Sequence, residues 1–297
     1  MTLQNAIEEF LIDQQVRGNT SKTLRYYRQT LRYYSDFIGG IAVGEITLRQ
    51  CKQYYLHLTK KNITTTSAQT YIRALRAFLR WCFDEGYIVE NIPARFKLPK
   101  AQRKAIDVLT DEEMRRLFSC FNLRTMTGSR DYAICALMLD SGLRLSEVLT
   151  LTRDAVHIPE GYCIVNGKGN KQRVVPFGLL AKKALIRYTG RLPICSVGTL
   201  FVVKDKLIPL THSGVMDMFR RLKRRADIPR LHPHLLRHSF ATRYLQAGGD
   251  VYSLQQILGH TTLEMVKHYL HMIPQQVIIS HTQFSPLDNL AKNAKKP

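Results

Sequence analysis

The chain has 297 residues, which is enough for one large domain or for two ordinary ones. Its hydrophobic content of 45% is typical of a globular protein, and no apolar run approaches the ~20 residues that a membrane-spanning helix needs. Lys and Arg number 44 against 23 Asp and Glu, a net charge of +21, and this excess favours a polyanionic partner such as DNA or RNA over a role of charge in solubility alone.

The cysteines and the N-terminus indicate the compartment. Six cysteines are scattered along the chain without a C-x-x-C pair, so neither a zinc ribbon nor a disulfide framework is predicted. The N-terminal stretch MTLQNAIEEFLIDQQ is acidic and amphipathic, unlike a signal peptide. We therefore expect a cytoplasmic protein with reduced thiols.

Helices are predicted throughout the first hundred residues. In residues 21–38, apolar side chains recur at alternating steps of three and four, which is one helical stripe, and residues 66–86 repeat the pattern. Further helices at about 3–16 and 46–61 would complete a four-helix unit. Two of the helices carry a basic flank beside the stripe, and two such flanks in one small domain suggest a surface that meets phosphates. The flanking residues are Arg25, Arg28 and Arg32 in the first helix and Arg73, Arg76 and Arg80 in the second.

A linker and a second domain follow. Residues 93–105 combine prolines and basic side chains without periodicity, which predicts a linker between an N-terminal domain, 1–92, and a C-terminal domain, 106–297. Thr110 and Glu113 form a capping-box signature that opens the first helix of the second domain. The predicted fold is mainly α, with a small antiparallel β-sheet where residues 162–177 form a hairpin.

Two short motifs carry candidate functional residues in the first half of the second domain. SGLRLSEVLTL places Arg144 and Glu147 one turn apart on an otherwise apolar helix. Arginine is rarely buried without a partner, so Arg144 is either paired with Glu147 or directed at an anion. NGKGNKQR places Lys168 at the predicted hairpin tip, where a lysine is more often simply solvated.

Two further motifs follow toward the C-terminus. HPHLLRH places His234 and Arg237 three apart on one helix face, and LGHTTLEMVKHYLH places His260 nine residues before Tyr269. Two arginines, a lysine and two histidines could surround a phosphate diester and neutralise the charge of a pentavalent transition state. A tyrosine would then be the nucleophile, helped by cationic neighbours or a base.

A metal site is the weaker alternative. His234 and His238 lie four apart and His268 and His271 three apart, both compatible with zinc. No carboxylate or cysteine has the spacing of an H-E-x-x-H motif, and arginines between the histidines would repel a cation. We predict neither a metal nor a cofactor.

In this order, the four motifs resemble those of the tyrosine recombinase, or lambda integrase-like, family, and its Xer-type members in particular. The resemblance implies a SAM-like helical core-binding domain followed by a catalytic DNA breaking-rejoining domain. It gives Glu147 a supporting role and assigns none to His232, His238 or His268; Tyr244 is expected in the core rather than as a rival nucleophile. The catalytic residues that it implies are Arg144, Lys168, His234, Arg237, His260 and Tyr269.

The resemblance also implies a function. It predicts a site-specific DNA recombinase that works through a 3′-phosphotyrosyl intermediate in DNA integration, excision or resolution, without metal or ATP. The implied partner is double-stranded DNA with an inverted-repeat site, bound by a homo- or hetero-tetramer that assembles through C-terminal residues 273–290. A cytoplasmic, nucleoid-associated location follows. The alternatives are a relaxing topoisomerase or hairpin-forming resolvase, and a catalytically silent sequence-specific DNA-binding protein.

Overall fold

The chain divides into two compact units, Met1–Lys104 and Ala105–Pro297, each with its own hydrophobic core. The computed structural model describes residues 1–61, 63–96, 98, 107–167, 172–193, 198–204, 206–260 and 262. Within these ranges, none of the helices has the length and apolar character needed to cross a membrane.

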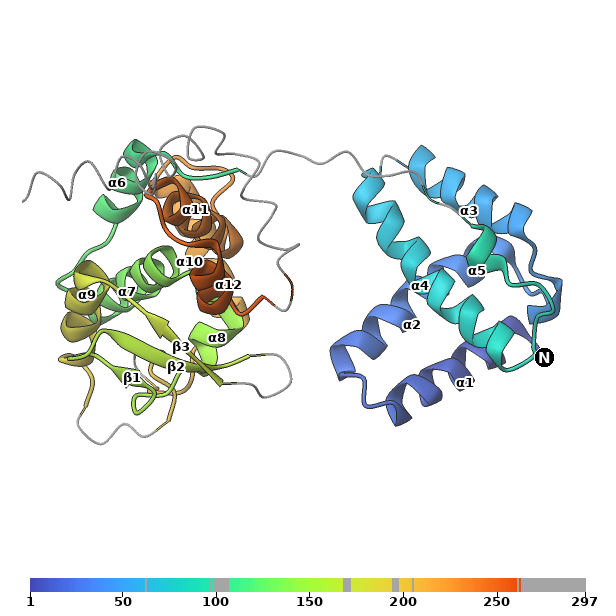
Figure 1. Cartoon of the computed structure of the whole chain (residues 1–297), viewed down its shortest axis with the longest axis horizontal. Helices are drawn as coiled ribbons and strands as arrows, with labels where there is room; N and C mark the ends of the chain where they lie inside the picture. The colour runs from blue at the N-terminus through green and yellow to red at the C-terminus, as the bar shows by residue number, and fades with distance from the viewer. Residues whose placement is uncertain are drawn as a thin grey trace, which may run out of the picture. The chain divides into compact units, whose positions relative to one another are not determined.

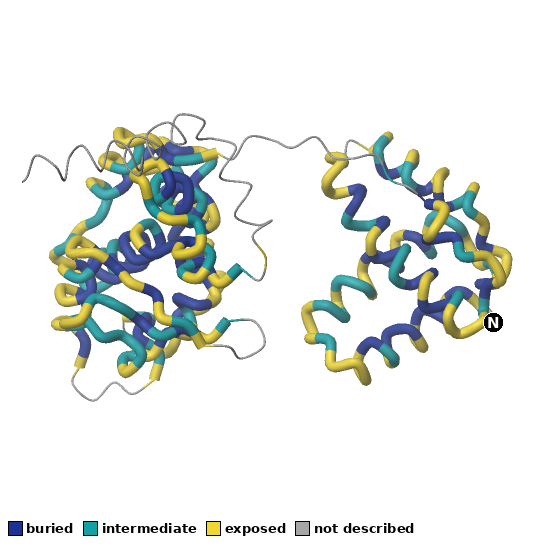
Figure 2. Tube along the Cα trace, in the orientation of Figure 1, coloured by how far each residue is buried: buried dark blue, intermediate teal, exposed yellow. Residues whose placement is uncertain are grey.

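The first unit is a bundle of four main helices (Figure 1). The predicted helical stripes face its core: Leu31 and Tyr34 are buried on one helix and Leu75 and Leu79 on another, which confirms the periodicity of the sequence (Figure 2). Its elements are α1 (Leu3–Val16), α2 (Ser21–Ile38), the 3₁₀ turn η1 (Val43–Glu45), α3 (Leu48–Lys60), α4 (Thr65–Asp84) and the short α5 (Ile92–Arg95).

Each of the four long helices begins after a threonine. The side-chain oxygens of Thr2, Thr20, Thr47 and Thr64 accept hydrogen bonds from backbone N–H groups in the first turn of α1, α2, α3 and α4. A hydroxyl in this position satisfies a donor that has no partner within the helix. The sequence therefore sets the start of every long helix in this unit locally.

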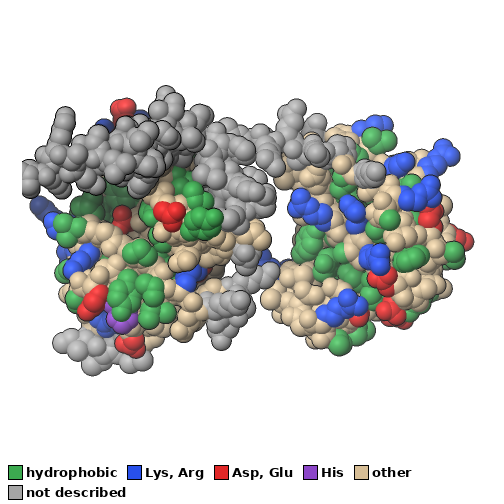
Figure 3. Space-filling view, in the orientation of Figure 1, with side chains coloured by type: hydrophobic (Ala, Val, Ile, Leu, Met, Phe, Trp, Pro, Cys, Tyr) green, Lys and Arg blue, Asp and Glu red, His purple; other side chains and the backbone are tan. Residues whose placement is uncertain are grey.

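The predicted basic flanks of α2 and α4 are largely exposed, and Lys and Arg side chains are spread over the visible face of the unit (Figure 3). Arg28 lies 3.8 Å from Glu8 and Arg80 lies 3.0 Å from Asp84, whereas Arg76 donates to the carbonyl of Pro93. Exposed ion pairs of this kind contribute little to stability. These arginines of the two flanks therefore have partners but stay largely accessible to solvent.

The second unit combines helices with a three-stranded sheet, which lies along the lower edge of the unit in Figure 1. The predicted hairpin is confirmed: β2 and β3 pair antiparallel, with Ile164 opposite Val174. A third strand, β1, is too short to leave a pattern in the sequence. The elements are α6 (Asp111–Ser119), α7 (Met126–Ser141), α8 (Leu145–Thr150), β1 (Val156–His157), β2 (Tyr162–Asn166), β3 (Gln172–Pro176), α9 (Leu179–Thr189), α10 (His212–Arg225), α11 (Pro233–Gln246) and α12 (Val251–Leu258).

Helix α7 is the centre of this unit. It packs against both α9 and α11, and the run from Ala133 to Met138 is buried on all sides. A helix that is apolar around its whole circumference belongs inside a domain. Its C-terminal end is thereby fixed, and the chain enters the candidate site directly from this end.

The segment before α6 is fastened to α11. The predicted capping box is confirmed, because Thr110 and Glu113 exchange hydrogen bonds between side chain and backbone at the start of α6. Arg243 of α11 donates to the carbonyl of Leu109 at 2.7 Å, and Ser239 accepts from the N–H of Leu109 at 2.8 Å. Arg243 also pairs with the carboxylate of Asp111, so side-chain and backbone contacts together fasten α11 to the start of α6.

Candidate active site

Arg144 lies at the start of α8, where the chain leaves α7. Gly142 ends α7 in the left-handed conformation, with φ of +66°, and a Cβ at this position would meet Phe240 at 2.4 Å. Arg144 is the residue before the first turn of α8, not a residue within the helix as the sequence pattern suggested. Its backbone N–H donates to Oε2 of Glu147 at 2.8 Å, and its Nη1 donates to Oε1 at 2.9 Å. The side chain is 31% exposed, so it is paired and also accessible.

Arg237 lies on α11 and is only 4% exposed. Its Nη1 donates to the carbonyl of Gly142 at 2.5 Å, and its Nη2 donates to the carbonyl of Leu258 at 2.8 Å. The same Nη2 lies 2.9 Å from Nε2 of His260. A planar guanidinium can hold several acceptors at fixed angles, so Arg237 ties together the ends of α7 and α12.

His260 reaches the site because α12 ends at Gly259, which has φ of +63°. A glycine in this conformation closes a helix and turns the chain back. Since an arginine cannot accept, Nε2 of His260 accepts from Arg237 and the proton of the neutral ring is on Nδ1. Burial, followed by the charges of Arg237, Arg144 and Arg173, lowers the pKa of His260 to about 4.

Arg173 of β3 is a site residue that motif reasoning missed. Its Nη1 and Nη2 donate to Oε1 and Oε2 of Glu147, both at 2.9 Å, and its Nε donates to the carbonyl of Ile257 at 2.8 Å. The sequence did contain a signal, because strand alternation places Arg173 on the same face as the buried Val175. An arginine on an inward face requires a partner, and here that partner comes from another element.

Glu147 is the acceptor that these arginines share. It is 5% exposed, and burial raises its pKa, but hydrogen bonds from Arg173 and Arg144 and the charge of Arg173 outweigh burial and lower the pKa overall. The carboxylate is therefore ionised. Two guanidiniums, those of Arg144 and Arg173, bind this one carboxylate. The guanidinium of Arg237 binds the carbonyl of Gly142, two residues before Arg144, so the cluster of three arginines and one carboxylate carries an excess of two positive charges.

The neighbouring histidines respond to the same field. His234 is exposed on α11, and its pKa is lowered by burial of part of the ring and then by the charges of Arg237, His232 and Arg144. The pKa of His238 is lowered in the same direction, by burial first and then by His234. The arginine charges that add to the effect of burial on these pKa values also favour binding of an anion.

The structure thus joins Arg237 and His260 by a hydrogen bond and brings Arg144 to the carbonyl of Gly259, next to His260, while the charges of Arg237 and Arg144 act on His234. Lys168 and Tyr269 lie outside the described residues, as do His268 and His271. The described part of the chain contains no group of three His, Cys, Asp or Glu side chains arranged to hold a metal ion.

The residues to which sequence reasoning gave no site role have structural contacts. Nδ1 of His232 lies 2.7 Å from the carbonyl of Arg230, just before α11. Tyr244 packs beside Phe240 against the small core formed by Ala241, Leu245, Leu254 and Leu258. The expectation that Tyr244 belongs to the core is confirmed.

Near neutral pH, the arrangement can bind one anion between two arginine side chains. Arg144 offers a partly exposed guanidinium beside the buried fork of Arg237, and the neutral His260 adds a group that can gain a proton when negative charge arrives. Such fixed donors stabilise a developing negative charge without reorganisation. A phosphate diester, rather than a metal, is the ligand that this chemistry fits.

Comparison with known proteins identifies the family. The model of the phage integrase family matches residues 107–276, and the model of the phage integrase SAM-like domain matches residues 2–98. The chain belongs to the phage integrase family of tyrosine recombinases.

Two relatives match almost the whole recombinase. It is 30% identical to tyrosine recombinase XerC of Oceanobacillus iheyensis, over 97% of this chain and 98% of the relative. It is 28% identical to tyrosine recombinase XerD of Halalkalibacterium halodurans, over 96% of this chain and 99% of the relative. These matches place the recombinase among the Xer-type members.

Solved structures share the fold. A lambda integrase dimer bound to a COC′ core site matches with a TM-score of 0.76 and 19% identity, over 91% of this chain and 95% of that chain. A lambda integrase tetramer bound to a Holliday junction matches with a TM-score of 0.71 and 18% identity, over 88% and 78%. The mainly helical fold with a small antiparallel sheet is confirmed.

The pKa of His260 makes stability depend on pH. Because its pKa is about 4 in the folded protein and near 6.5 when unfolded, the unfolded state binds a proton more readily between these values. The stability that the neutral ring contributes is present above about pH 6.5 and is lost as pH falls toward 4. His260→Asn should therefore flatten the decline in the free energy of unfolding, measured by urea denaturation at several pH values from 7 to 4. Parallel curves for the two proteins would contradict this assignment.

Proposed function

We propose that this tyrosine recombinase cleaves and rejoins DNA at a specific site by forming a 3′-phosphotyrosyl intermediate, with Arg144, Lys168, His234, Arg237, His260 and Tyr269 as its catalytic residues. The observation that carries the proposal is the cluster of three guanidiniums, two of them bound to a single buried carboxylate and the third bound to His260 and backbone carbonyls, with an excess of two positive charges. Belonging to the tyrosine recombinase family supports the assignment of the chemistry.

The proposed roles follow from the chemistry of each group. Arg144 and Arg237 bind the non-bridging oxygens of the scissile phosphate and stabilise the pentavalent transition state. The Tyr269 hydroxyl attacks phosphorus as its proton passes to a histidine of the site, and the phosphorus–oxygen bond to the 5′-oxygen breaks. Lys168 supplies a proton to that departing oxygen.

The histidines complete the proposed site. His260 accepts from Arg237 in the DNA-free protein, and an arriving phosphate would raise its pKa so that it can donate to an oxygen of the anion. His234 offers an exposed imidazole at the start of the same helix for proton transfer. The phosphotyrosyl ester conserves the energy of the broken backbone, so attack by a 5′-hydroxyl reseals the strand without ATP.

The exposed arginines of the first unit are the proposed contacts to the DNA backbone. Arg25 and Arg73 are exposed on α2 and α4, beside Arg28 and Arg80, whose carboxylate partners are themselves exposed. Arginines exchange exposed carboxylates for phosphates at little cost, and each phosphate contact adds affinity that falls with salt. With binding of this kind, the proposed location is on chromosomal DNA in the cytoplasm.

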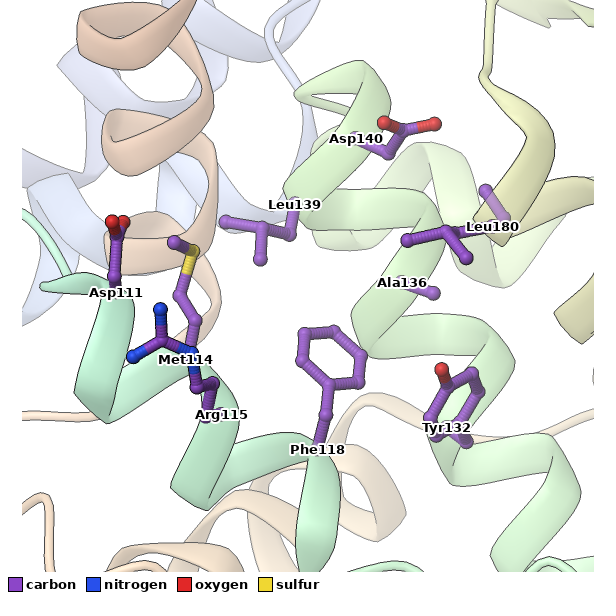
Figure 4. Close-up of a pocket in the computed structure, with 10 residues that line it drawn as sticks. Asp111, Met114, Arg115, Phe118, Tyr132, Ala136, Leu139, Asp140 and Leu180 are labelled. Carbon is purple, nitrogen blue, oxygen red and sulfur yellow. The ribbon is translucent and has the colours of Figure 1, made fainter.

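An apolar pocket in the second unit is the proposed receiver for assembly on DNA. It has a volume of about 400 Å³ and lies between α6, α7 and α9. Phe118, Leu139 and Leu180 extend into the same space, and Tyr132 lies beside them (Figure 4). None of these residues belongs to the arginine cluster, so the pocket serves another purpose.

The proposed occupant is residues 273–290 of a neighbouring protomer in a tetramer on DNA. This segment contains the apolar run Val277, Ile278 and Ile279, which could fill the pocket. A tetramer would join two duplexes, with two protomers at the inverted repeats of each site; a second type of recombinase could supply two of the four. The segment itself lies outside the described residues.

Leu180→Asp should weaken assembly without weakening the binding of one protomer to DNA. Leu180 is 72% exposed, so the substitution leaves folding intact while placing a charge in the pocket. Sedimentation of the protein on DNA with two inverted half-sites should show fewer multimers. Ile186→Asp is the matched control, because Ile186 is 52% exposed on the same helix but does not line the pocket. Equal assembly of both variants would count against the pocket as receiver.

The function is tested by trapping the intermediate. Footprinting of the purified protein on DNA flanking its gene would locate the binding site, and a duplex of that sequence with a nick near the cleavage position would then be incubated with it. The 5′-hydroxyl fragment diffuses away from nicked DNA, so a covalent adduct that survives SDS should accumulate. Specific footprints without any adduct would instead indicate the silent DNA-binding protein.

A further inference from the structure

Arg173 connects three elements around Glu147. Its strand β3 pairs with β2, where Arg173 lies opposite Val165, and its side chain is 13% exposed. Two hydrogen bonds reach Glu147 on α8, and a third reaches the carbonyl of Ile257 in α12. The end of α12, just before His260, packs closely against the side chain of Arg173: a Cβ at Gly259 would lie 3.0 Å from the guanidinium.

The carboxylate of Glu147 is fully used by these contacts. Oε1 accepts from Nη1 of Arg173 and from Nη1 of Arg144, and Oε2 accepts from Nη2 of Arg173 and from the backbone N–H of Arg144. Each oxygen therefore has two donors. Arg173 provides both of its η nitrogens, whereas the side chain of Arg144 provides one.

This unequal sharing leaves Arg144 available. Its second η nitrogen makes a long contact of 3.4 Å with the carbonyl of Gly259, and 31% of the side chain is exposed. If Arg173 were absent, a carboxylate that is 5% exposed would keep a single charged partner. Removing one partner of a buried charge is costly, and Arg144 would be drawn inward into a two-point pair with Glu147.

We propose that Arg173 is a positioning residue. Its two hydrogen bonds to the Glu147 carboxylate mean that Arg144 needs only one η nitrogen for that carboxylate and keeps the other edge of its guanidinium for the scissile phosphate. This inference rests on the proposed function of Arg144. Arg173 does not contact the phosphate; it acts through Glu147 on Arg144 and through Ile257 on the turn that carries His260. Its role is to occupy both carboxylate oxygens of Glu147 with a two-point charged pair, which differs from a purely structural role that only fastens the hairpin.

The test compares Arg173→Gln with the double variant Arg173→Gln and Glu147→Gln, using adduct formation on the nicked duplex. The single variant should form adduct about 10- to 100-fold more slowly, as is typical when a supporting residue is lost. The double variant should recover much of that rate, since a glutamine at 147 can still accept from the N–H of Arg144 but no longer attracts its guanidinium. If Arg173 only fastened the hairpin, the double variant would not recover the rate of adduct formation, because the second substitution restores no contact to β3.

A physical readout accompanies the kinetics. Carboxyl NMR titration should show that the pKa of Glu147 rises in Arg173→Gln, because burial is then less compensated. Thermal unfolding checks that each variant is folded; should Arg173→Gln fail to fold, Arg173→Lys keeps the charge but loses the two-point pair, and the same slower adduct formation and its recovery by Glu147→Gln are expected. Arg230→Gln is the matched control, because Arg230 also binds a carboxylate with both η nitrogens, that of Glu113, away from the cluster. It should lose stability but not cleavage rate.

The outcomes separate the two proposals. Folded Arg173→Gln with the rate of the unaltered protein, or a slow single variant that the second substitution does not improve, would overturn the positioning role alone. Absence of adduct from the unaltered protein would overturn the proposed function instead.

Discussion

Tyr269→Phe should abolish the covalent protein–DNA adduct and leave DNA affinity unchanged. The substitution removes one hydroxyl and keeps the ring, so folding and phosphate contacts persist while the nucleophile is lost. Adduct on the nicked duplex should fall below detection in an SDS gel, whereas the footprint at the same protein concentration should be retained.

Tyr252→Phe is the matched control for this experiment. Tyr252 is exposed on α12, the helix that ends just before His260, and it undergoes the same chemical change. It should form adduct at the rate of the unaltered protein. Adduct formation by Tyr269→Phe, or its loss in Tyr252→Phe alone, would reassign the nucleophile; peptide mapping of the adduct would then identify it.

Arg237→Lys should reduce the rate of adduct formation by about 10²- to 10³-fold, the usual effect of losing one preorganised donor to a transition state. Lysine keeps the charge but not the planar fork that holds the carbonyls of Gly142 and Leu258 and the ring of His260. Single-turnover assays at saturating protein separate this loss from any change in DNA affinity.

The burial of Arg237 also predicts a loss of stability. Arg237→Ala would leave buried carbonyl groups without a donor, which should lower the free energy of unfolding by about 1–3 kcal/mol for each unsatisfied group. Arg237 is therefore expected to contribute to stability as well as to cleavage. Arg243→Lys is the control for position on α11, because Arg243 binds the carbonyl of Leu109 outside the cluster. It should cost stability and spare cleavage. Equal loss of cleavage in both variants would show that α11 is merely sensitive to any substitution.

Much of the fold follows from local sequence. The alternating stripes of α2 and α4 predicted the buried faces, and the capping box at Thr110 predicted where α6 begins, because these signals act within one or two helical turns. The hairpin of β2 and β3 was equally local. Strand β1 was missed because its two residues are too few to show an alternating pattern.

The site was predicted in part. Motif order identified Arg144, His234, Arg237 and His260, and the structure joins Arg237 to His260 by a hydrogen bond and brings Arg144 to the carbonyl of the neighbouring Gly259. The roles of these residues, and those of Lys168 and Tyr269, remain predictions for the experiments above. Sequence reasoning offered Arg144 two states, paired with Glu147 or directed at an anion, and it could not choose between them.

The sequence by itself determined the types and the order of the candidate site residues, which are arginines, histidines and a tyrosine, and it determined most of the helices that carry them. Tertiary structure alone decided how their charges are shared. Arg173 meets Glu147 across 26 residues and Arg237 meets Gly142 across 95, and no local pattern encodes such pairs. The physical reason is that a buried charge must find its partners wherever the packed elements place them, so the second arginine on Glu147 became visible only when β3, α8 and α12 were assembled.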